Sequence, residues 1–540
     1  MKKKNKSFIK GAFTLGIAGI ISKIMGFSYR IILPRIIGAE GIGLYQLAYP
    51  IYTSLLVIST TGVPISLAKL ISEKIARDRY CKAYKLFRVC LGLSFTIGLF
   101  LTFLMTISAS PVIQLFNWDQ RSLYSILAIS PAIFIVSIMS AYRGFFQGLH
   151  NMRPTAYSQI IEQFVRIITM IILTYIFLPY GIEFAAAGAT FGAVTGAGGG
   201  LLLLIYIYWK QKHDIWENIK VKAITYYNIK ENTKKIVSLA VPVTFGAMIH
   251  PLMSFVDAAI VPSRLQIAGF TNSLKLYGQL SGMAMVLVHF PTVITLALST
   301  SLVPAISEAS ARKDSQLIKK RTYTSLRLTI LIALPASTGL FIMAESLTTL
   351  LFNSPGAAIP LRFVAWGVLF IALKQITSAT LQGMGKVIIS ARNLLIGAVF
   401  NGIINYVLTA SPNYRIRGAA LGTVTGFAVA AVLNLYYTWK WTKLKMNLKH
   451  IIIIPLVSSA MMAIFIWKSF GPVYRIYSMF LNKYIYGITI FTIIFLSFII
   501  YFLLLLIFKE IKYSDLILIP GIGIKIAEFL SRIGLVNKKE

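Results

Sequence analysis

The sequence predicts an all-α polytopic membrane protein with 14 transmembrane helices, built as two parallel-repeat six-helix lobes plus two C-terminal helices. Three observations support this fold class. The 540 residues are 57% hydrophobic with a mean hydropathy of +0.74. Apolar runs of about 20 residues, the length needed to cross a bilayer, recur along nearly the whole chain. Basic clusters separate these runs and account for the net charge of +36, which is typical of membrane topology rather than of nucleic-acid binding.

The predicted spans alternate with loops that differ in their charge. Lysine and arginine are concentrated in alternate loops, which the positive-inside rule assigns to the cytoplasm, so both termini are expected there, in a bacterial cytoplasmic membrane. The basic N-terminus has no signal-peptide cleavage site and is interpreted as part of a retained first helix. The spans are expected at about 8–33, 44–70, 87–109, 122–147, 157–178, 185–209, 234–260, 276–303, 323–345, 358–383, 389–410, 417–441, 449–467 and 484–508.

Three pairs of motifs indicate an internal repeat. The segment Ile71-Ser72-Glu73 recurs as Ile306-Ser307-Glu308, and Gln147-Gly148 recurs as Gln382-Gly383. GATFGAVTG from Gly188 recurs as GAALGTVTG. Each pair lies 230 to 235 residues apart with six spans between its members, so the two copies have the same membrane orientation and a substrate path is expected between them.

The repeat gives a domain division and a packing prediction. The expected regions are an N-lobe at 1–210, a cytoplasmic linker at 211–233, a C-lobe at 234–441, two added spans at 442–508 and a cytoplasmic amphipathic tail at 509–540. The glycines recur every fourth residue in the sixth and twelfth spans, a spacing that favours close helix packing over substrate contact. Gln147 and Gln382 are expected to end their helices in turns.

The first span contains two cations at membrane depth. Lys23 and Arg30 are seven positions apart, which places them on one helix face. A cation in this position costs about 2.5–3.5 kcal/mol on insertion scales and normally faces protein or a water-filled cavity. We therefore expect an anion-binding cavity around this face. The alternative is that both side chains only extend to the nearest interface.

Four other charged residues within the spans are candidates for the same cavity. Arg143 near the end of the fourth span either lines the cavity or anchors the helix at the cytoplasmic side. Glu162 and Arg166 are at i and i+4, and a structural pair is favoured over a ligand site. Lys374 lies too deep in the tenth span to reach water fully, so the cavity is favoured for it.

The C-terminal half supplies candidates for ion coupling or charge pairing. Asp257 is one of very few acids at membrane depth and either holds a coupling cation or pairs with a basic neighbour. His250 and His289 are expected to be neutral and hydrogen-bonded rather than proton-coupled. Asn401 and Asn405 at i and i+4 favour hydrogen bonds between helices over contacts with sugars.

Several segments resemble one family over the whole chain. They are SKIMGFSYRIILPRIIGAEGIGLYQLAYPIY from Ser22, GQLSGMAM, FPTVITLALSTSLVPAISEA and TLQGMGK. They resemble the stage V sporulation protein B family, in the polysaccharide-exporter branch of the multidrug/oligosaccharidyl-lipid/polysaccharide flippase superfamily. The MurJ-type lipid II flippases are related to it.

The resemblance implies an alternating-access flippase with a central cavity. Its cargo would be an undecaprenyl-pyrophosphate-linked cell-wall precursor, lipid II-like or for spore cortex peptidoglycan, or a polysaccharide intermediate. The match to the cavity arginines of MurJ-type proteins is partial: Lys23 falls on one basic position, Arg30 lies one residue from another, and the eighth span offers only His289.

Motifs for nucleotide hydrolysis or metalloprotease chemistry are not found, so we expect a transporter rather than an enzyme, with no cofactor or metal. A Na⁺ or H⁺ gradient is a candidate energy source. The expected partners are the lipid-linked oligosaccharide, membrane lipids and cell-wall synthases, with no nucleic acid, and the protein is expected to be a monomer. Two alternatives remain: a cation-coupled drug exporter of the same fold, and a scaffold for cell-wall enzymes that transports nothing. The PGIG sequence near the C-terminus is interpreted as leading into an interfacial helix rather than a DNA-binding hairpin.

Overall fold

The protein is entirely helical in the part of the chain that the structure describes. The structure is a computed structural model that describes residues 2–211, 229–444, 447–480, 483–511, 513 and 523–533. Every regular element among these residues is a helix, which confirms the predicted class. Most of the expected linker at 211–233 and much of the tail, including its PGIG sequence, lie outside the described residues.

Eleven described helices are long and apolar enough to cross a membrane, or up to 13 if each of two bent helix pairs counts as one span. The predicted count of 14 is therefore not confirmed as such. The first segment, Thr14–Ile75, is 62 residues long and covers both of the first two expected spans. Gly38 breaks this segment with a φ of 65°, a backbone conformation that favours glycine. A straight helix of this length would measure about 93 Å, roughly three times the thickness of the hydrocarbon core.

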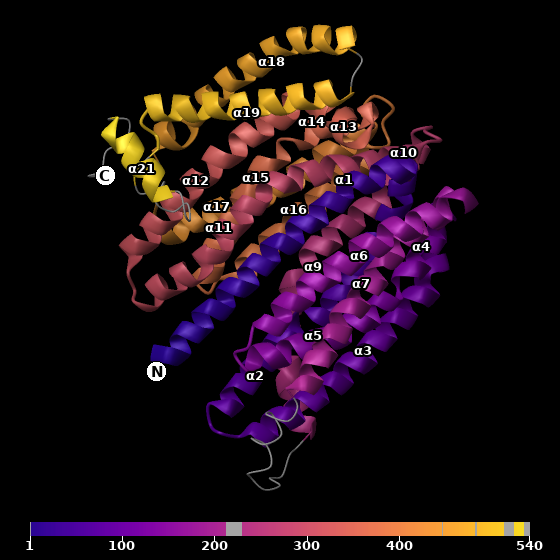
Figure 1. Ribbon diagram of the computed structural model, residues 1–540, viewed down its shortest axis with the longest axis vertical. Coiled ribbons are helices and arrows are strands. Elements are labelled where there is room, and N and C mark those ends of the chain that lie inside the picture. The colour runs from indigo at the N-terminus through magenta and orange to yellow at the C-terminus, as the bar shows by residue number, and fades with distance from the viewer. Residues whose placement is uncertain are drawn as a thin grey trace. The chain divides into compact units, whose positions relative to one another are not determined.

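The chain forms two compact units, each described here by itself. The first contains Met1–Val286 and Ile404–Ala419. Figure 1 shows α3, α5, α6 and α7 of this unit running beside one another. Its helices are α1 (Lys2–Thr60), α2 (Gly62–Ile75), α3 (Tyr80–Leu115), α4 (Ser122–Ile129), α5 (Pro131–Gly148), α6 (Arg153–Phe177), the short turn η1 (Leu178–Tyr180), α7 (Ile182–Lys210), α9 (Ile229–Ile267), α10 (Ser273–Tyr277), the π-helix η2 (Gly278–Ala284) and the ends of three elements shared with the second unit.

The second unit contains Leu287–Ile403 and Ala420–Glu540. Its last long helices, α18 and α19, pack on each other, and α18 packs on α12 (Figure 1). Its helices are α11 (Met285–Ala311), α12 (Ser315–Ile342), α13 (Ala344–Phe352), α14 (Ala358–Val364), α15 (Gly367–Gly383), α16 (Val387–Leu408), α17 (Ile416–Thr442), α18 (Ile454–Phe480), α19 (Lys483–Ile507) and α21 (Gly523–Arg532). Two short turns, η3 (Pro355–Ala357) and η4 (Lys449–Ile453), also belong to it.

The repeated Gln-Gly motifs form the same local structure in both copies. A Cβ atom added to Gly148 would lie 2.7 Å from the Ile71 side chain, and one added to Gly383 would lie 2.6 Å from Ile306. Helices α5 and α2 thus touch at the same repeat positions as α15 and α11. The backbone N–H groups of His150 and Gly385, two residues after each glycine, donate to the carbonyls of Gln147 and Gln382 at 2.9 Å in both cases. The predicted helix-ending turns are confirmed, and the two copies share this contact.

The glycine spacing of the sixth span also has the predicted packing role. A Cβ atom at Gly192 would lie 3.0 Å from the Arg166 carbonyl, and one at Gly196 would lie 2.6 Å from the Glu162 carbonyl. Small residues on α7 therefore let it press directly against the α6 backbone. In the second copy, a Cβ at Gly397 would lie 2.3 Å from the carbonyl of Gly426, which corresponds to Gly196.

The C-terminal helices are held by a buried carboxylate as well as by an apolar core. Glu510, just after α19, is 2% exposed, and its carboxylate is in hydrogen-bond contact with Nδ1 of the His450 ring. The Arg327 guanidinium on α12 donates to the Glu510 carbonyl at 3.2 Å. Helix α21 packs Ala527 and Leu530 against Leu506 of α19. Its opposite residue Phe529 is 63% exposed, which is the pattern expected of an amphipathic helix at a membrane surface.

Candidate functional site

Three of the predicted site residues meet inside the first unit. The Glu162 carboxylate accepts a hydrogen bond from Arg166 Nη2 at 2.8 Å and one from Arg143 Nη2 at 2.9 Å. Glu162 is 9% exposed and Arg166 is 8% exposed. Arg143 Nε also donates to the Ser158 hydroxyl at 3.0 Å. The favoured pairing of Glu162 with Arg166 is confirmed, and Arg143 joins it through a contact that the sequence did not predict.

This cluster has more positive than negative charge. Two guanidinium groups share one carboxylate, so the three residues together have a net charge of +1. Arginine keeps its proton under all ordinary conditions, so deprotonation cannot remove this charge. A buried charge without full compensation is costly, and an anion that approached the cluster would be stabilised by it.

Arg30 lies among tyrosines rather than carboxylates. Its Nε atom is 3.4 Å from the Tyr29 hydroxyl, and its guanidinium carbon is 5.9 Å from the centre of the same ring. A cavity of about 20 Å³, room for one water molecule, lies between Arg30, Tyr29, Tyr45 and Gln46. Ion pairs to Arg30 are not found within the described residues.

A row of tyrosines on α1 lies near both Arg30 and Arg166. The Tyr45 and Tyr49 rings stack with centroids 5.5 Å apart, and Tyr49 and Tyr52 follow at 5.7 Å. Arg166 interacts electrostatically with Tyr49, Tyr52 and Tyr29. Phenol groups can donate hydrogen bonds to oxyanions as well as accept from arginine. The tyrosines were not predicted as site residues, although their spacing on one helix face at 45, 49 and 52 is visible in the sequence.

Neither of the two predicted lysines forms an ion pair with a carboxylate among the residues that the structure describes. Lys23 is exposed and lies on the same face of α1 as Arg30. Lys374 is half-buried on α15 in the second unit, beside Gln375, which accepts a hydrogen bond from Thr295 at 2.6 Å. Hydrogen-bond and ion-pair partners for the Lys374 ammonium are not found among the residues that the structure describes. A half-buried ammonium group without an ion-pair partner would be stabilised by a bound anion.

Asp257 on α9 is held by an amide. Asn405 Nδ2 of α16 donates to Asp257 Oδ1 at 2.7 Å, so the predicted role of Asn405 in bonding between helices is confirmed. The next residue, Ala258, accepts from the Trp118 indole at 2.9 Å, which fixes this part of α9. His289 is half-buried on α11, and the side chain of His250 lies outside the described part of the structure.

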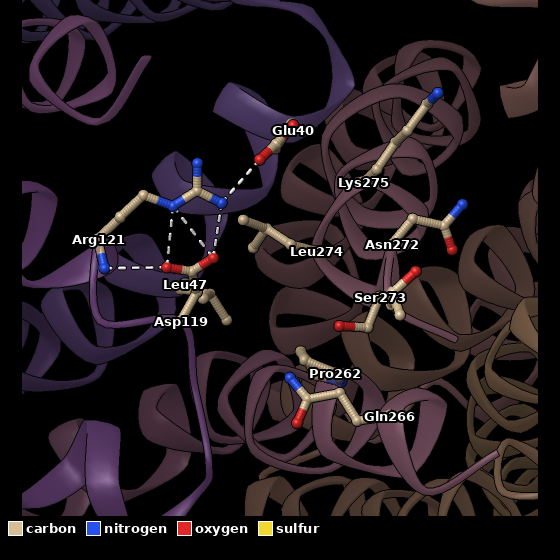
Figure 2. A pocket seen from close by; sticks show the side chains of 11 residues that line it. Glu40, Leu47, Asp119, Arg121, Pro262, Gln266, Asn272, Ser273, Leu274 and Lys275 are labelled. Atoms are coloured by element: carbon tan, nitrogen blue, oxygen red, sulfur yellow. Dashed lines mark hydrogen bonds and ion pairs between the residues drawn. The ribbon is translucent and has the colours of Figure 1, made fainter. Parts of the chain in front are cut away.

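A second polar region of the first unit was not predicted. Arg121, in the turn between α3 and α4, bonds Asp119 and Glu40 through Nη2, at 2.7 Å each (Figure 2). Burial raises the pKa of the Asp119 carboxyl, but hydrogen bonds from the Arg121 side chain and backbone outweigh this effect and hold the pKa below its usual value. These bonds likewise raise the pKa of Arg121. The signal in the sequence was a group of opposite charges in a short loop between two apolar spans.

Comparisons with known proteins agree with this architecture. Residues 8–310 match the family described as "Polysaccharide biosynthesis protein", and residues 280–407 match MatE. Stage V sporulation protein B of Bacillus subtilis (strain 168) is 34% identical over 96% of this chain and 98% of that protein. Lipid II flippase MurJ of the same organism is 29% identical over 79% of this chain and 82% of that protein.

Solved structures share the fold at low sequence identity. Lipid II flippase MurJ in an inward closed conformation superposes with a TM-score of 0.67 and 17% identity, over 93% of this chain and 99% of that one. An inward-facing multidrug resistance MATE family transporter superposes with a TM-score of 0.65 and 16% identity, over 80% and 98% of the two chains. At this level of identity the likeness concerns the fold alone.

Proposed function

Because the chain belongs to the family of polysaccharide biosynthesis proteins, which its match over residues 8–310 establishes, we propose that it is a flippase for a lipid-linked cell-wall or polysaccharide precursor. The relatives named as flippases support a transporter rather than an enzyme. The proposed cargo is an undecaprenyl-pyrophosphate-linked precursor of the lipid II type, moved by alternating access from the inner to the outer leaflet. The spore cortex is one destination, in keeping with the name of the relative that is 34% identical.

The observation that carries this proposal is the surplus positive charge of the Arg143–Glu162–Arg166 cluster. A diphosphate head group needs cations within the membrane, and arginine binds phosphate oxygens through paired hydrogen bonds. The Glu162 carboxylate forms an ion pair with both Arg143 and Arg166 and so orients both guanidinium groups. It neutralises only one of their two positive charges, which leaves one for the ligand. A neutral cargo would gain nothing from that charge.

The remaining cations would complete the path. Lys23 and Arg30 on one face of α1 would meet the diphosphate, with the tyrosine row donating hydrogen bonds to its oxygens. Lys374 would bind the same group from the second unit at another stage of transport.

Asp257 is proposed to serve in coupling transport to Na⁺ or H⁺. Asn405 already holds one carboxylate oxygen, and an amide oxygen beside a carboxylate is a favourable donor set for a hard cation. His250 and His289 remain candidates for proton coupling. The membrane potential is another energy source, at about 2.3 kcal/mol per charge per 100 mV. Flipping at a potential clamped to zero, with and without a Na⁺ or pH gradient, separates these sources.

Both termini are proposed to lie in the cytoplasm of a bacterial cell, as the basic loops predict. The protein is proposed to act as a monomer in contact with membrane lipids and with cell-wall synthases. Labelling of single cysteines placed at Lys4 and Lys509 with an impermeant reagent tests the topology. Labelling of intact cells at either position would contradict it.

The decisive experiment measures flipping of fluorescent lipid II in proteoliposomes. We expect Lys23→Ala, Arg30→Gln and Lys374→Ala each to lower the rate at least about tenfold, the effect of one lost charge-assisted hydrogen bond. Lys440→Ala is the matched control, because Lys440 is an exposed lysine at the end of α17. A parallel series with another undecaprenyl-pyrophosphate-linked sugar defines the cargo. Wild-type protein that flips neither lipid would overturn the proposed function.

A further inference from the structure

The first unit contains a polar cavity that the proposed transport path does not use. Its volume is about 280 Å³. Three segments that are distant in sequence form its walls: the α1 residues around Glu40, the turn with Asp119 and Arg121, and the end of α9 with the start of α10 (Figure 2). All three are expected outer-side loops or helix ends. None of the Arg143–Glu162–Arg166 cluster lines the cavity.

The walls of this cavity are fixed before any ligand arrives. Trp118 is 4% exposed, and its indole bond to Ala258 ties the turn to α9. The Asp119 carbonyl accepts from the Ser122 hydroxyl at 2.7 Å. On the opposite wall, a Cβ atom at Gly43 would lie 2.4 Å from the Leu274 carbonyl. Close packing of this kind holds polar groups in position at little entropic cost on binding.

The charges that line the cavity cancel. Glu40 and Asp119 contribute two negative charges, and Arg121 and Lys275 contribute two positive ones. An isolated phosphate or metal ion would therefore find no net charge to neutralise its own. An uncharged ligand with many hydroxyl groups suits this lining, since the cavity offers donors and acceptors in nearly equal number.

Several hydrogen-bonding groups that line the cavity are exposed or have a free donor. The Nη1 group of Arg121 makes no bond to the described residues, and Figure 2 shows it directed away from both carboxylates. The exposed Asn272 has no side-chain bond to its own helix. Gln266, Thr271 and Lys275 are also exposed at the cavity. Such groups are available to a ligand without breaking an existing contact.

The volume of the cavity also limits the size of the ligand that it can hold. A volume of 280 Å³ corresponds to about nine water molecules. It lies just below the range of about 300–1,000 Å³ for drug-sized ligands, whose sites are mostly apolar. One sugar ring fits these dimensions, and a disaccharide with a peptide does not.

We propose that this cavity binds one uncharged sugar ring, a hexose or an N-acetylhexosamine, on the outer side of the protein. The sugar would belong to a lipid-linked chain that has reached the outer leaflet, and in this respect the proposal rests on the proposed function. Bound there, the sugar would hold the translocated head group away from the transport path. The ring hydroxyls would bond Arg121 Nη1, the free oxygen of Glu40 and the Asn272 amide.

The test is binding of N-acetylglucosamine to the full-length protein in lipid nanodiscs, followed by saturation-transfer NMR and calorimetry. We expect saturable binding to the wild type, about fivefold weaker in Asn272→Ala and at least tenfold weaker in Arg121→Gln. Asn272→Ala leaves the ion pairs intact, so it keeps the test valid if Arg121→Gln folds poorly. Arg362→Gln is the matched control, because Arg362 is in an exposed ion pair with Glu345 at 3.3 Å and does not line the cavity.

Competition experiments separate the parts of the proposal. Lipid II in the nanodisc should displace the free sugar; if it does not, the lipid-linked source is wrong and a free saccharide is the ligand. Displacement by inorganic phosphate, equal affinity in both cavity variants, or no binding to the wild type would overturn the site. Lys23→Ala should bind the sugar normally, because Lys23 does not line the cavity. Wild-type protein that binds the sugar but flips no lipid would count against the proposed function alone.

Discussion

The two copies of the internal repeat differ most where their helices meet in the interior. The first copy places Arg143, Glu162 and Arg166 there, bonded to one another at 2.8 and 2.9 Å. A shift of 235 residues leads from Arg143 to Ser378 and from Arg166 to Asn401 in the second copy. The charged cluster of one copy is thus replaced by neutral residues in the other.

The second copy fills its interior with a neutral network. Asn393 donates to Asn434 at 2.9 Å, Asn434 donates to the Ser378 hydroxyl at 2.9 Å, and Ser390 donates to Ser378 at 2.7 Å. Asn393 and Asn434 are fully buried. The network links α15, α16 and α17, which correspond to α5, α6 and α7. Neutral hydrogen bonds are therefore sufficient to join these three helices.

This comparison separates structural from functional roles. Since the neutral copy shows that the frame can form without charge, the charge of the first copy is not explained by packing. Buried ion pairs are also weak contributors to stability, because their desolvation offsets their attraction. The surplus cation of the first copy is better explained by an anionic ligand than by the fold.

The largest predicted effect comes from replacing the charged cluster of the first copy by neutral residues, with Ser and Asn taken from the second copy and Ala at 162, where the second copy has Gly397. In Arg143→Ser/Glu162→Ala/Arg166→Asn, no charge is left unpaired, so we expect membrane insertion and thermal stability close to the wild type. Flipping of lipid II should fall at least 100-fold, because the diphosphate loses two arginines. Proteoliposome flipping and the melting temperature in detergent are the measurements. A variant that flips at the wild-type rate would show that the cluster is structural.

The second-largest predicted effect is a loss of stability caused by the single substitution Glu162→Gln. Glu162→Gln removes the carboxylate and leaves two buried guanidinium groups facing each other, which should cost about 3–5 kcal/mol in free energy of unfolding. Reversible unfolding in mixed micelles measures this loss. Restoration of stability in the triple variant above is the control, and an unchanged free energy in Glu162→Gln would mean that the ion pairs are not formed.

How far the sequence predicted this arrangement depends on whether the contacts are local. The Glu162–Arg166 pair is one helical turn apart and was predicted from spacing, as was the packing of Gly196. The contact of Arg143 with Glu162 joins two helices whose rotation the sequence does not specify. The span count was predicted only approximately, because apolar runs do not show that two helix pairs are bent or that the first two expected spans meet directly at a kink at Gly38.

The cavity around Arg121 could not be predicted for the same reason. Its walls come from α1, the α3–α4 turn and α10, and Glu40 is 81 residues from Arg121. Hydropathy and charge pattern place all three segments on one side of the membrane, but they contain no information on lateral neighbours. Contacts between residues distant in sequence bring these segments together: the Arg121–Glu40 ion pair, the Trp118–Ala258 hydrogen bond and the close approach of Gly43 to Leu274.

A smaller effect is expected in the neutral copy. Asn434→Ala removes the centre of the network and leaves Asn393 and Ser378 each short of one partner, which should cost about 1–3 kcal/mol. Flipping should change less than threefold, because no ligand contact is lost. Unfolding in mixed micelles measures the loss of stability, and proteoliposome flipping measures the change in transport rate. A large loss of flipping with full stability would place the ligand in the second copy as well.

The smallest predicted effect concerns the Asp119–Arg121 ion pair, which lies outside the membrane, and what it contributes to stability in comparison with the buried cluster. The native pKa of Asp119 is below its unfolded value, so its pairing with Arg121 stabilises the fold above about pH 4 and is lost as the pH falls through the native pKa. Because both side chains are partly exposed, the contribution should stay below about 1 kcal/mol. Asp119→Asn should therefore lower the melting temperature slightly at pH 7 and leave it unchanged at pH 2 to 3. A difference in melting temperature that persists at the lower pH would mean that the Asp119 side chain acts through shape rather than charge. The loss of stability caused by Glu162→Gln in the buried cluster should instead be the same at every pH at which the protein stays folded.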